Sequence, residues 1–131
     1  MAKISHINLS VSNMNRSIVF YDELLFSLGF TKGLDESGDW GAVRGYKGEG
    51  IELEIIHEKD IEYKEFNRYV GLNHIAFEVD NREKVSEMFE LVKRLGVEIT
   101  REPKEYPEYT EKYYAFYFRD PDGIPLEIAF V

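Results

Sequence analysis

Two separate stretches of the chain alternate apolar and polar residues with the period of a β-strand. In residues 4–11, Ile7, Leu9 and Val11 alternate with polar neighbours, and residues 74–79 repeat the pattern. Because successive side chains of a strand point to opposite faces, each stretch predicts a strand with one buried face and one polar face.

An amphipathic helix is predicted after each of these strands, because apolar residues recur there at spacings of three and four. The apolar positions are Ile18, Tyr21, Leu25 and Leu28 in the first helix and Val85, Met88, Val92 and Leu95 in the second. Asn13 and Asn81 precede the helices where a side chain can cap free N–H groups. Gly29 and Gly96 follow them where a left-handed residue is favoured.

The chain contains an internal repeat. The sequence HINLSVSN at 6–13 is matched by HIAFEVDN at 74–81, and LEII at 53–56 is matched by LEIA at 126–129. Matches in the same order along both halves indicate a duplicated unit. Three further strands are expected in each copy: 30–33, 40–46 and 51–57 in the first, and 97–101, 113–119 and 125–130 in the second.

The predicted fold class is therefore α+β, with two tandem βαβββ modules that form an open, curved mixed sheet around a metal or ligand cavity. We expect one domain over residues 1–131, with repeats at 1–57 and 73–131. The charged, aperiodic segment 58–72 is expected to be an ordered connector.

The amino-acid composition limits the possible metal ligands and binding partners. The chain has no cysteine, so any metal must be bound by nitrogen and oxygen ligands. Its 25 acidic and 16 basic residues give a net charge of −9, which disfavours nucleic acid as a partner. No segment approaches the roughly 20 apolar residues of a membrane span, and the first residues do not resemble a signal peptide. We therefore expect a cytoplasmic protein with no membrane partner.

Each copy places one histidine and one glutamate on the polar face of its strands. His6 and His74 lie in the two first strands, and Glu54 and Glu127 lie in the two closing strands. All four side chains are expected to point into one cavity. Two imidazoles and two carboxylates can bind a first-row divalent ion and leave positions open for water or substrate. The sequence thus predicts a catalytic metal site.

Two further residues near Glu54, one glutamate and one histidine, must be considered as possible metal ligands. Glu52 shares its strand face with Glu54, so either could be the ligand, although Pro125 stands at the position of Glu52 in the second copy. His57 lies on the opposite face, has no counterpart in the repeat, and is expected to be exposed.

The chain resembles the glyoxalase, bleomycin-resistance and dihydroxybiphenyl-dioxygenase superfamily, also called vicinal oxygen chelate proteins. The resemblance covers nearly the whole chain and is carried by HINLSV, SIVFYDELLFSLGF, GLNHIAFEV and, most specifically, YFRDPDGIPLEI. It implies a glyoxalase-like fold and a homodimer, in which the metal site is sometimes shared between subunits. It also implies one divalent ion (nickel, zinc, manganese, iron or cobalt) held by His6, Glu54, His74 and Glu127.

By resemblance to glyoxalase I, the implied activity is that of a metal-dependent lyase or isomerase. Its small oxygenated substrate would be derived from a 2-oxoaldehyde or a related compound, and Glu127 or Glu54 would move the proton. Strand parity adds four residues expected to bind substrate beside the metal: Arg44, Trp40, Tyr113 and Tyr117.

Other activities within the same superfamily remain open. A fosfomycin-resistance type hydrolase or transferase would use His6, His74 and Glu127 and leave Glu54 spare. A ring-cleaving dioxygenase usually needs about twice this length. A protein similar to the bleomycin-resistance members would sequester a small molecule without catalysis, and the acidic, aromatic composition suits a cationic ligand.

Overall fold

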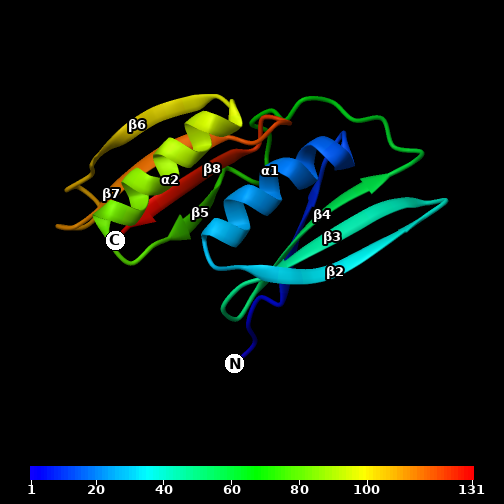
Figure 1. The fold of residues 1–131 in the computed structure, drawn as a ribbon, viewed down its shortest axis with the longest axis horizontal. Coiled ribbons are helices and arrows are strands. Elements are labelled where there is room, and N and C mark those ends of the chain that lie inside the picture. Colours follow the sequence, from blue (N-terminus) through cyan, green and yellow to red (C-terminus); the bar gives the residue numbers. More distant parts are fainter. The chain divides into compact units, whose positions relative to one another are not determined.

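The computed structural model describes residues 1–131 as two units, Met1–Lys64 (module 1) and Glu65–Val131 (module 2). Each module contains one helix and one four-stranded sheet, and the helix packs on one face of its sheet (Figure 1). The predicted α+β fold of two βαβββ modules is confirmed.

Module 1 consists of β1 (His6–Ser10), α1 (Met14–Ser27), β2 (Thr31–Gly38), β3 (Gly41–Lys47) and β4 (Glu52–Glu58). The strands lie in the order β1-β4-β3-β2. β1 is parallel to β4, whereas the other neighbours are antiparallel. This is the arrangement expected when a helix makes the crossover between parallel strands and tight turns connect the rest.

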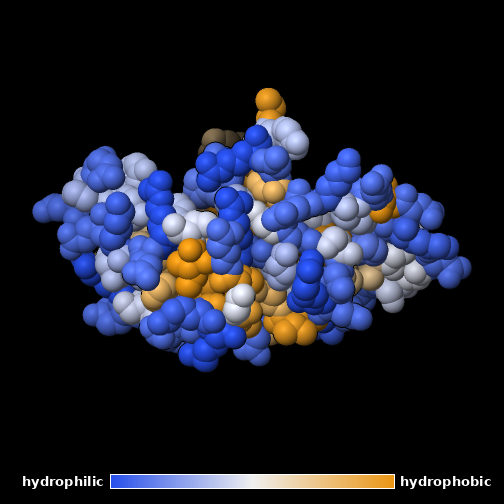
Figure 2. Space-filling model, turned by 90° about the horizontal axis from the view of Figure 1, so that it is seen from above, coloured by the Kyte–Doolittle hydropathy of each residue, from blue (hydrophilic) through white to orange (hydrophobic).

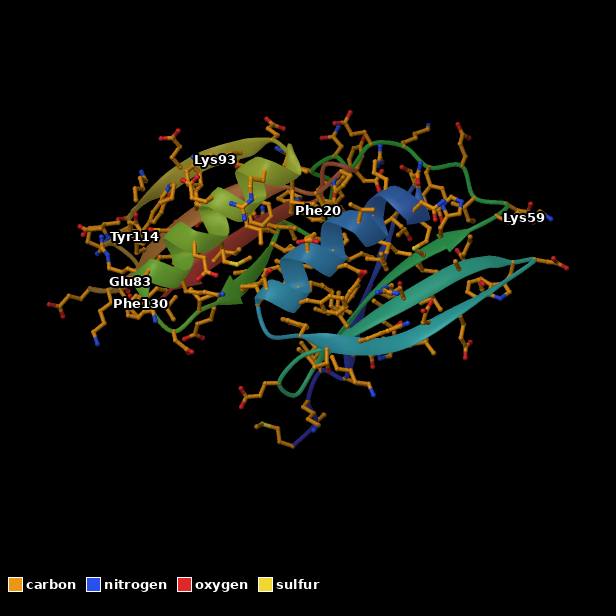
Figure 3. The ribbon with its side chains drawn as sticks, in the orientation of Figure 1. Phe20, Lys59, Glu83, Lys93, Tyr114 and Phe130 are labelled. Atoms are coloured by element: carbon orange, nitrogen blue, oxygen red, sulfur yellow. The ribbon has the colours of Figure 1, made fainter.

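Module 2 repeats the arrangement with β5 (Ile75–Glu78), α2 (Arg82–Leu95), β6 (Ile99–Glu105), β7 (Tyr114–Arg119) and β8 (Pro125–Phe130). The strand order is β5-β8-β7-β6, and β5 is parallel to β8. Charged side chains of α2, such as Glu83 and Lys93, lie on its solvent side (Figure 3).

The predicted helix ends are confirmed. Asn13 accepts a hydrogen bond from the backbone N–H of Arg16, and Asn81 accepts one from the N–H of Lys84. Gly29 and Gly96 follow the helices with φ angles of 90° and 75°, in the left-handed region.

The buried face of α1 differs from the predicted stripe. Tyr21 and Leu25 are buried as expected, but Ile18 and Leu28 are only half-buried. Ser17, Phe20 and Leu24 are buried in addition. The helix is apolar over much of its circumference, so spacing alone did not determine which side packs on the sheet.

β2 and β6 are longer than predicted and reach Gly38 and Glu105. Both are edge strands, and most of their added residues are polar and exposed. Backbone pairing with β3 and β7 forms them, with irregular register in both pairs. Alternation of apolar residues could not reveal strands that bury so little.

The expectation that His57 is exposed was wrong. Its ring is half-buried, with Nδ1 lying 2.8 Å from the carbonyl oxygen of Val11, and it stacks on Tyr63 at 4.8 Å between ring centroids. The hydrogen bond and the ring contact fix the end of β4 to the chain on either side.

No helix is long and apolar enough to cross a membrane; each has 14 residues. Hydrophilic residues cover most of the face seen in Figure 2, in keeping with the charge of the chain.

Candidate active site

A buried carboxylate lies on the face of the module 2 sheet that α2 does not cover. Glu127, in the middle of β8, is 1% exposed. The hydroxyl of Tyr113 donates a hydrogen bond of 2.6 Å to its Oε1, and Nε2 of His74 lies 3.2 Å from its Oε2. Tyr117, opposite Glu127 on β7, also interacts with the carboxylate. Three predicted site residues thus surround Glu127.

The two tyrosines beside Glu127 are held in their neutral form. Burial raises the pKa of both Tyr113 and Tyr117, and hydrogen bonding to Glu127 raises it further. Each hydroxyl therefore keeps its proton beyond the pH at which an ordinary tyrosine ionises, and it remains a donor to the carboxylate in alkaline solution.

The orientation of His74 is set by its neighbour. Nδ1 lies 2.7 Å from Oδ1 of Asn73, an atom that can only accept a hydrogen bond. In this arrangement Nδ1 carries a hydrogen and Nε2 faces Glu127. A carbonyl oxygen on one imidazole nitrogen is the usual way in which proteins aim the other nitrogen at a metal ion.

Two tyrosines that the sequence did not single out complete the wall around this carboxylate. Tyr106 is 1% exposed, and its ring contacts those of Tyr113 and Tyr117 at centroid distances of 6.1 and 5.8 Å. Tyr109 contacts Tyr113 at 5.1 Å. Both residues lie between β6 and β7, where the alternation of a strand does not apply; the only sequence signal that could have indicated them is the number of tyrosines in residues 101–114.

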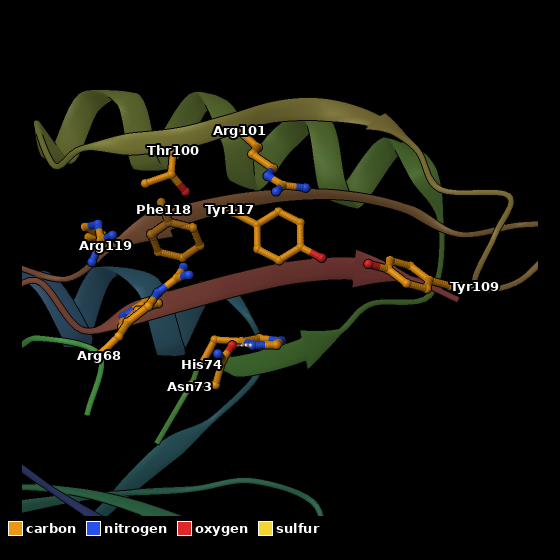
Figure 4. Close-up of a pocket in the computed structure, with 10 residues that line it drawn as sticks. Arg68, Asn73, His74, Thr100, Arg101, Tyr109, Tyr117, Phe118 and Arg119 are labelled. Carbon is orange, nitrogen blue, oxygen red and sulfur yellow. Dashed lines mark hydrogen bonds between the residues drawn. The ribbon is translucent and has the colours of Figure 1, made fainter. Parts of the chain in front are cut away.

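A cavity of about 270 Å³ opens beside His74 and Tyr117, and all the residues that line it belong to module 2 (Figure 4). Three arginines contribute to its wall, together with Thr100: Arg68, Arg101 and Arg119. The sequence did not single out these arginines, because they come from the connector and from two strands, and no spacing relates them.

In module 1, the strand register makes Glu54 the counterpart of Glu127. Asn8, two residues after His6, lies opposite Glu54, just as Ala76, two residues after His74, lies opposite Glu127. Asn8 donates a hydrogen bond of 2.9 Å to Glu54. His6 is exposed, and its Nδ1 lies 3.3 Å from the Ser5 hydroxyl.

Glu52 has a different environment. Its carboxylate accepts a hydrogen bond from the backbone N–H of Leu34 at 3.2 Å and occupies the space beside Gly33 and Gly45, where a Cβ atom would collide with it. It thus packs against β2 and β3, whereas Glu54 is bonded to Asn8 of β1, so the register with β1 is what favours Glu54 as the counterpart of Glu127.

Arg44 and Trp40 lie elsewhere than strand parity led us to expect. Arg44 is opposite Ile55 and points to the face covered by α1, where it pairs with Asp22 at 2.7 Å. Because Gly45 rather than Arg44 is opposite Glu54, the parity assumed for β3 differs by one residue. Trp40 lies in the β2–β3 turn and is 46% exposed.

Neither module by itself brings together three histidine, aspartate or glutamate side chains able to hold a metal ion. Module 2 supplies one imidazole nitrogen and one carboxylate, which are suitable donors for a divalent first-row ion but too few for a typical site. The four-residue set that includes His6 and Glu54 stays a prediction of the repeat.

Comparison with known proteins identifies the family. The model of the Glyoxalase/Bleomycin resistance protein/Dioxygenase superfamily matches residues 3–128. The chain belongs to this superfamily. It is 28% identical to the uncharacterized protein YqjT of Bacillus subtilis (strain 168), over 95% of each chain. It is also 28% identical to the metallothiol transferase FosB of Shouchella clausii (strain KSM-K16), over 95% of this chain and 77% of FosB.

The fold is shared with solved structures. The crystal structure of a glyoxylase/bleomycin resistance protein/dioxygenase domain from Frankia sp. EAN1pec superimposes with a TM-score of 0.81, covering 99% of this chain and 98% of that one at 22% identity. At this identity the similarity supports the fold only, and the activity must be argued from the site.

Proposed function

We propose that this protein is a metal-dependent lyase or isomerase of glyoxalase I type, acting on a small oxygenated substrate. The observation that carries the proposal is the pairing of His74 with the buried carboxylate of Glu127 on the open face of module 2. Membership of the superfamily supports it, and the relationship to FosB, a protein named as a metallothiol transferase, supports the use of a metal.

The His74–Glu127 pair offers two electron-pair donors that a cation can bind. With its hydrogen on Nδ1, a neutral His74 presents the lone pair of Nε2 to Oε2 of Glu127 at 3.2 Å. Two acceptors at that distance repel each other. A cation bound by both groups would remove the repulsion. A divalent ion is the occupant that would also give the pair a catalytic use.

The proposed ligands are His74 and Glu127 from module 2 and their counterparts His6 and Glu54 from module 1. The ion, when bound, would polarise a substrate oxygen and acidify the neighbouring carbon. Glu127 is the proposed base that takes the proton from that carbon, with Glu54 as the alternative. Tyr113 and Tyr117 orient Glu127 and keep it shielded from water.

A second candidate is a transferase or hydrolase of the fosfomycin-resistance type. The relationship to FosB over most of both chains favours it. In this case His6, His74 and Glu127 would hold the ion, and Glu54 would remain bonded to Asn8. Sequestration of a cationic ligand without catalysis is disfavoured in module 2, because three arginines line its cavity.

The proposal is tested by measuring thermal stability and turnover after chelation and after re-addition of nickel, zinc, manganese, ferrous iron or cobalt. A bound ion should raise the unfolding midpoint. His74→Ala and Glu127→Gln should abolish that gain, whereas Glu90→Gln, a matched loss of charge on the outer surface of α2, should keep it.

Turnover should be screened with thiol adducts of 2-oxoaldehydes and with epoxides. Metal-dependent turnover of the adducts supports the lyase, and metal-dependent opening of an epoxide by a thiol or water supports the second candidate. The enzymatic proposal fails if no ion stabilises the wild-type protein or if Glu127→Gln turns over substrate normally.

We also propose, from the family resemblance, that the chain forms a homodimer in the cytoplasm. Light scattering of the purified protein checks the first point, since a mass of twice 15.4 kDa is expected.

A further inference from the structure

The cavity of module 2 is positively charged in a chain that is strongly negative overall. Arg68, Arg101 and Arg119 line it, and no aspartate or glutamate does. The chain carries 25 acidic residues against 16 basic ones, so a wall with three guanidinium groups and no carboxylate departs from the rest of the surface. Such a wall concentrates anions.

Two of the three arginines have no carboxylate partner. Arg101 reaches from β6 over the ring of Tyr117, at 5.6 Å from the ring centroid, and Arg68 reaches from the connector (Figure 4). Arg119 differs, because it donates to the carbonyl of Gly123 at 3.0 Å and approaches Glu98 at 3.4 Å. Arg101 also interacts with the hydroxyl of Tyr106, a neutral partner. Arg68 and Arg101 are therefore the guanidinium groups whose charge no carboxylate neutralises.

The segment that carries Arg68 is attached to the β7–β8 turn. The backbone N–H of Phe66 donates to the carbonyl of Asp122 at 3.0 Å, and a Cβ atom on Gly123 would touch Glu65 at 3.4 Å. The start of module 2 thus packs on the β7–β8 turn. From this segment Arg68 lies across the cavity from Arg101 (Figure 4).

The remaining polar groups of the wall suit the same kind of ligand. Thr100 offers a hydroxyl, and Asn73 and His74 offer further polar atoms at the mouth of the site described above. A guanidinium group binds an oxyanion through paired N–H groups, which neither an alcohol nor a neutral carbonyl can match. At about 270 Å³, the cavity has room for a small molecule only.

We propose that the substrate carries an oxyanion, either a carboxylate or a phosphorus oxyanion, and that Arg68 and Arg101 bind this group beside His74. This inference rests on the proposed function, because only an enzyme would use the bound molecule as a substrate. The anion site itself requires no metal. In the proposed reaction, the oxyanion would be anchored in the cavity while the reacting carbon lies toward Glu127.

The test measures binding of inorganic phosphate and of acetate to the metal-free protein, by calorimetry at constant ionic strength set with chloride. Wild-type protein should bind at least one of the two anions. Arg68→Gln and Arg101→Gln should each raise the Kd about tenfold, as expected when a charge-assisted hydrogen bond is lost. Arg94→Gln, the same change in the last turn of α2, should leave the Kd unchanged.

Both target arginines are exposed, so the variants should fold, and their unfolding midpoints provide the check. The inference is overturned if wild-type protein binds neither anion, or if Arg94→Gln weakens binding as much as the two cavity variants do. Metal binding separates the two proposals. Loss of anion binding with an intact metal response refutes only this inference, and the reverse result refutes only the proposed function.

Discussion

The hydrogen bond from Tyr113 to Glu127 should contribute measurably to stability, and Tyr113→Phe removes it with almost no change in shape. The bond is 2.6 Å long and ends on a carboxylate that is 1% exposed. Hydrogen bonds to charged groups contribute about 1.5–3 kcal/mol. Because Tyr113 itself is only half-buried, the lower end applies, and we expect a loss of about 1.5 kcal/mol.

The loss is measured by urea unfolding followed by circular dichroism. With a slope of about 2 kcal/mol per molar urea, the midpoint should fall by about 0.75 M. The matched control is Tyr109→Phe, because Tyr109 is in the same cluster but is 59% exposed; its effect should stay within about 0.5 kcal/mol. Equal effects of the two substitutions would refute the reasoning, since the hydrogen bond from Tyr113 to the buried carboxylate would then contribute nothing to stability.

Three further predictions concern the modules. Above pH 10 the protein should lose stability, because burial raises the pKa of three tyrosines, which ionise first in the unfolded chain: Tyr46, Tyr113 and Tyr117. An alkaline unfolding series checks this, and flat stability to pH 12 would contradict it. Asp22→Asn should lower the free energy of unfolding by roughly 2 kcal/mol, because it leaves Arg44, whose side chain is 13% exposed, without its main carboxylate partner. Urea unfolding of the variant and of wild type measures this loss, and an unchanged midpoint would argue against the pairing. Gly41→Ala should abolish folding of module 1, because its φ is +139° and the new Cβ would collide with the carbonyl of His57; Gly33→Ala, whose Cβ would meet the flexible carboxylate of Glu52 and lie 3.2 Å from the backbone of Gly45, should be milder, and equal midpoints would contradict this.

The repeat was the feature of the sequence that predicted most of the fold. It relates the two histidines, the two helix caps and the two closing strands, and a duplicated unit must bury matched positions in matched ways. Asn13 and Asn81 cap their helices because capping depends on neighbours three residues away, which a sequence displays directly.

The features that the sequence did not predict depend on register. Arg44 was expected in the cavity beside the metal, but the register of β3 places it opposite Ile55, on the other face of the sheet. The polar edge strands β2 and β6 exist because of backbone pairing rather than burial. No local sequence pattern predicts the register of β3 or the presence of these edge strands.

The cavity arginines depend on tertiary structure in the same way. Arg68, Arg101 and Arg119 come from the connector, β6 and β7, and they form one wall only because the start of module 2 packs on the β7–β8 turn. In the sequence, each of these arginines taken alone is indistinguishable from an ordinary surface residue. The observation that points to an oxyanion is that the three arginines line one cavity, which the sequence does not show.

The central claim is that His74 and Glu127 bind a metal ion, and the metal content of the protein tests it most directly. Wild-type protein, His74→Ala and Glu127→Gln should be loaded with nickel or manganese, freed of excess ion by gel filtration, and analysed for metal per chain, with Glu90→Gln as the control. The account predicts about one ion per chain in wild type and control and almost none in the two site variants. An equal amount of metal in all four proteins, or none in wild type, would contradict it.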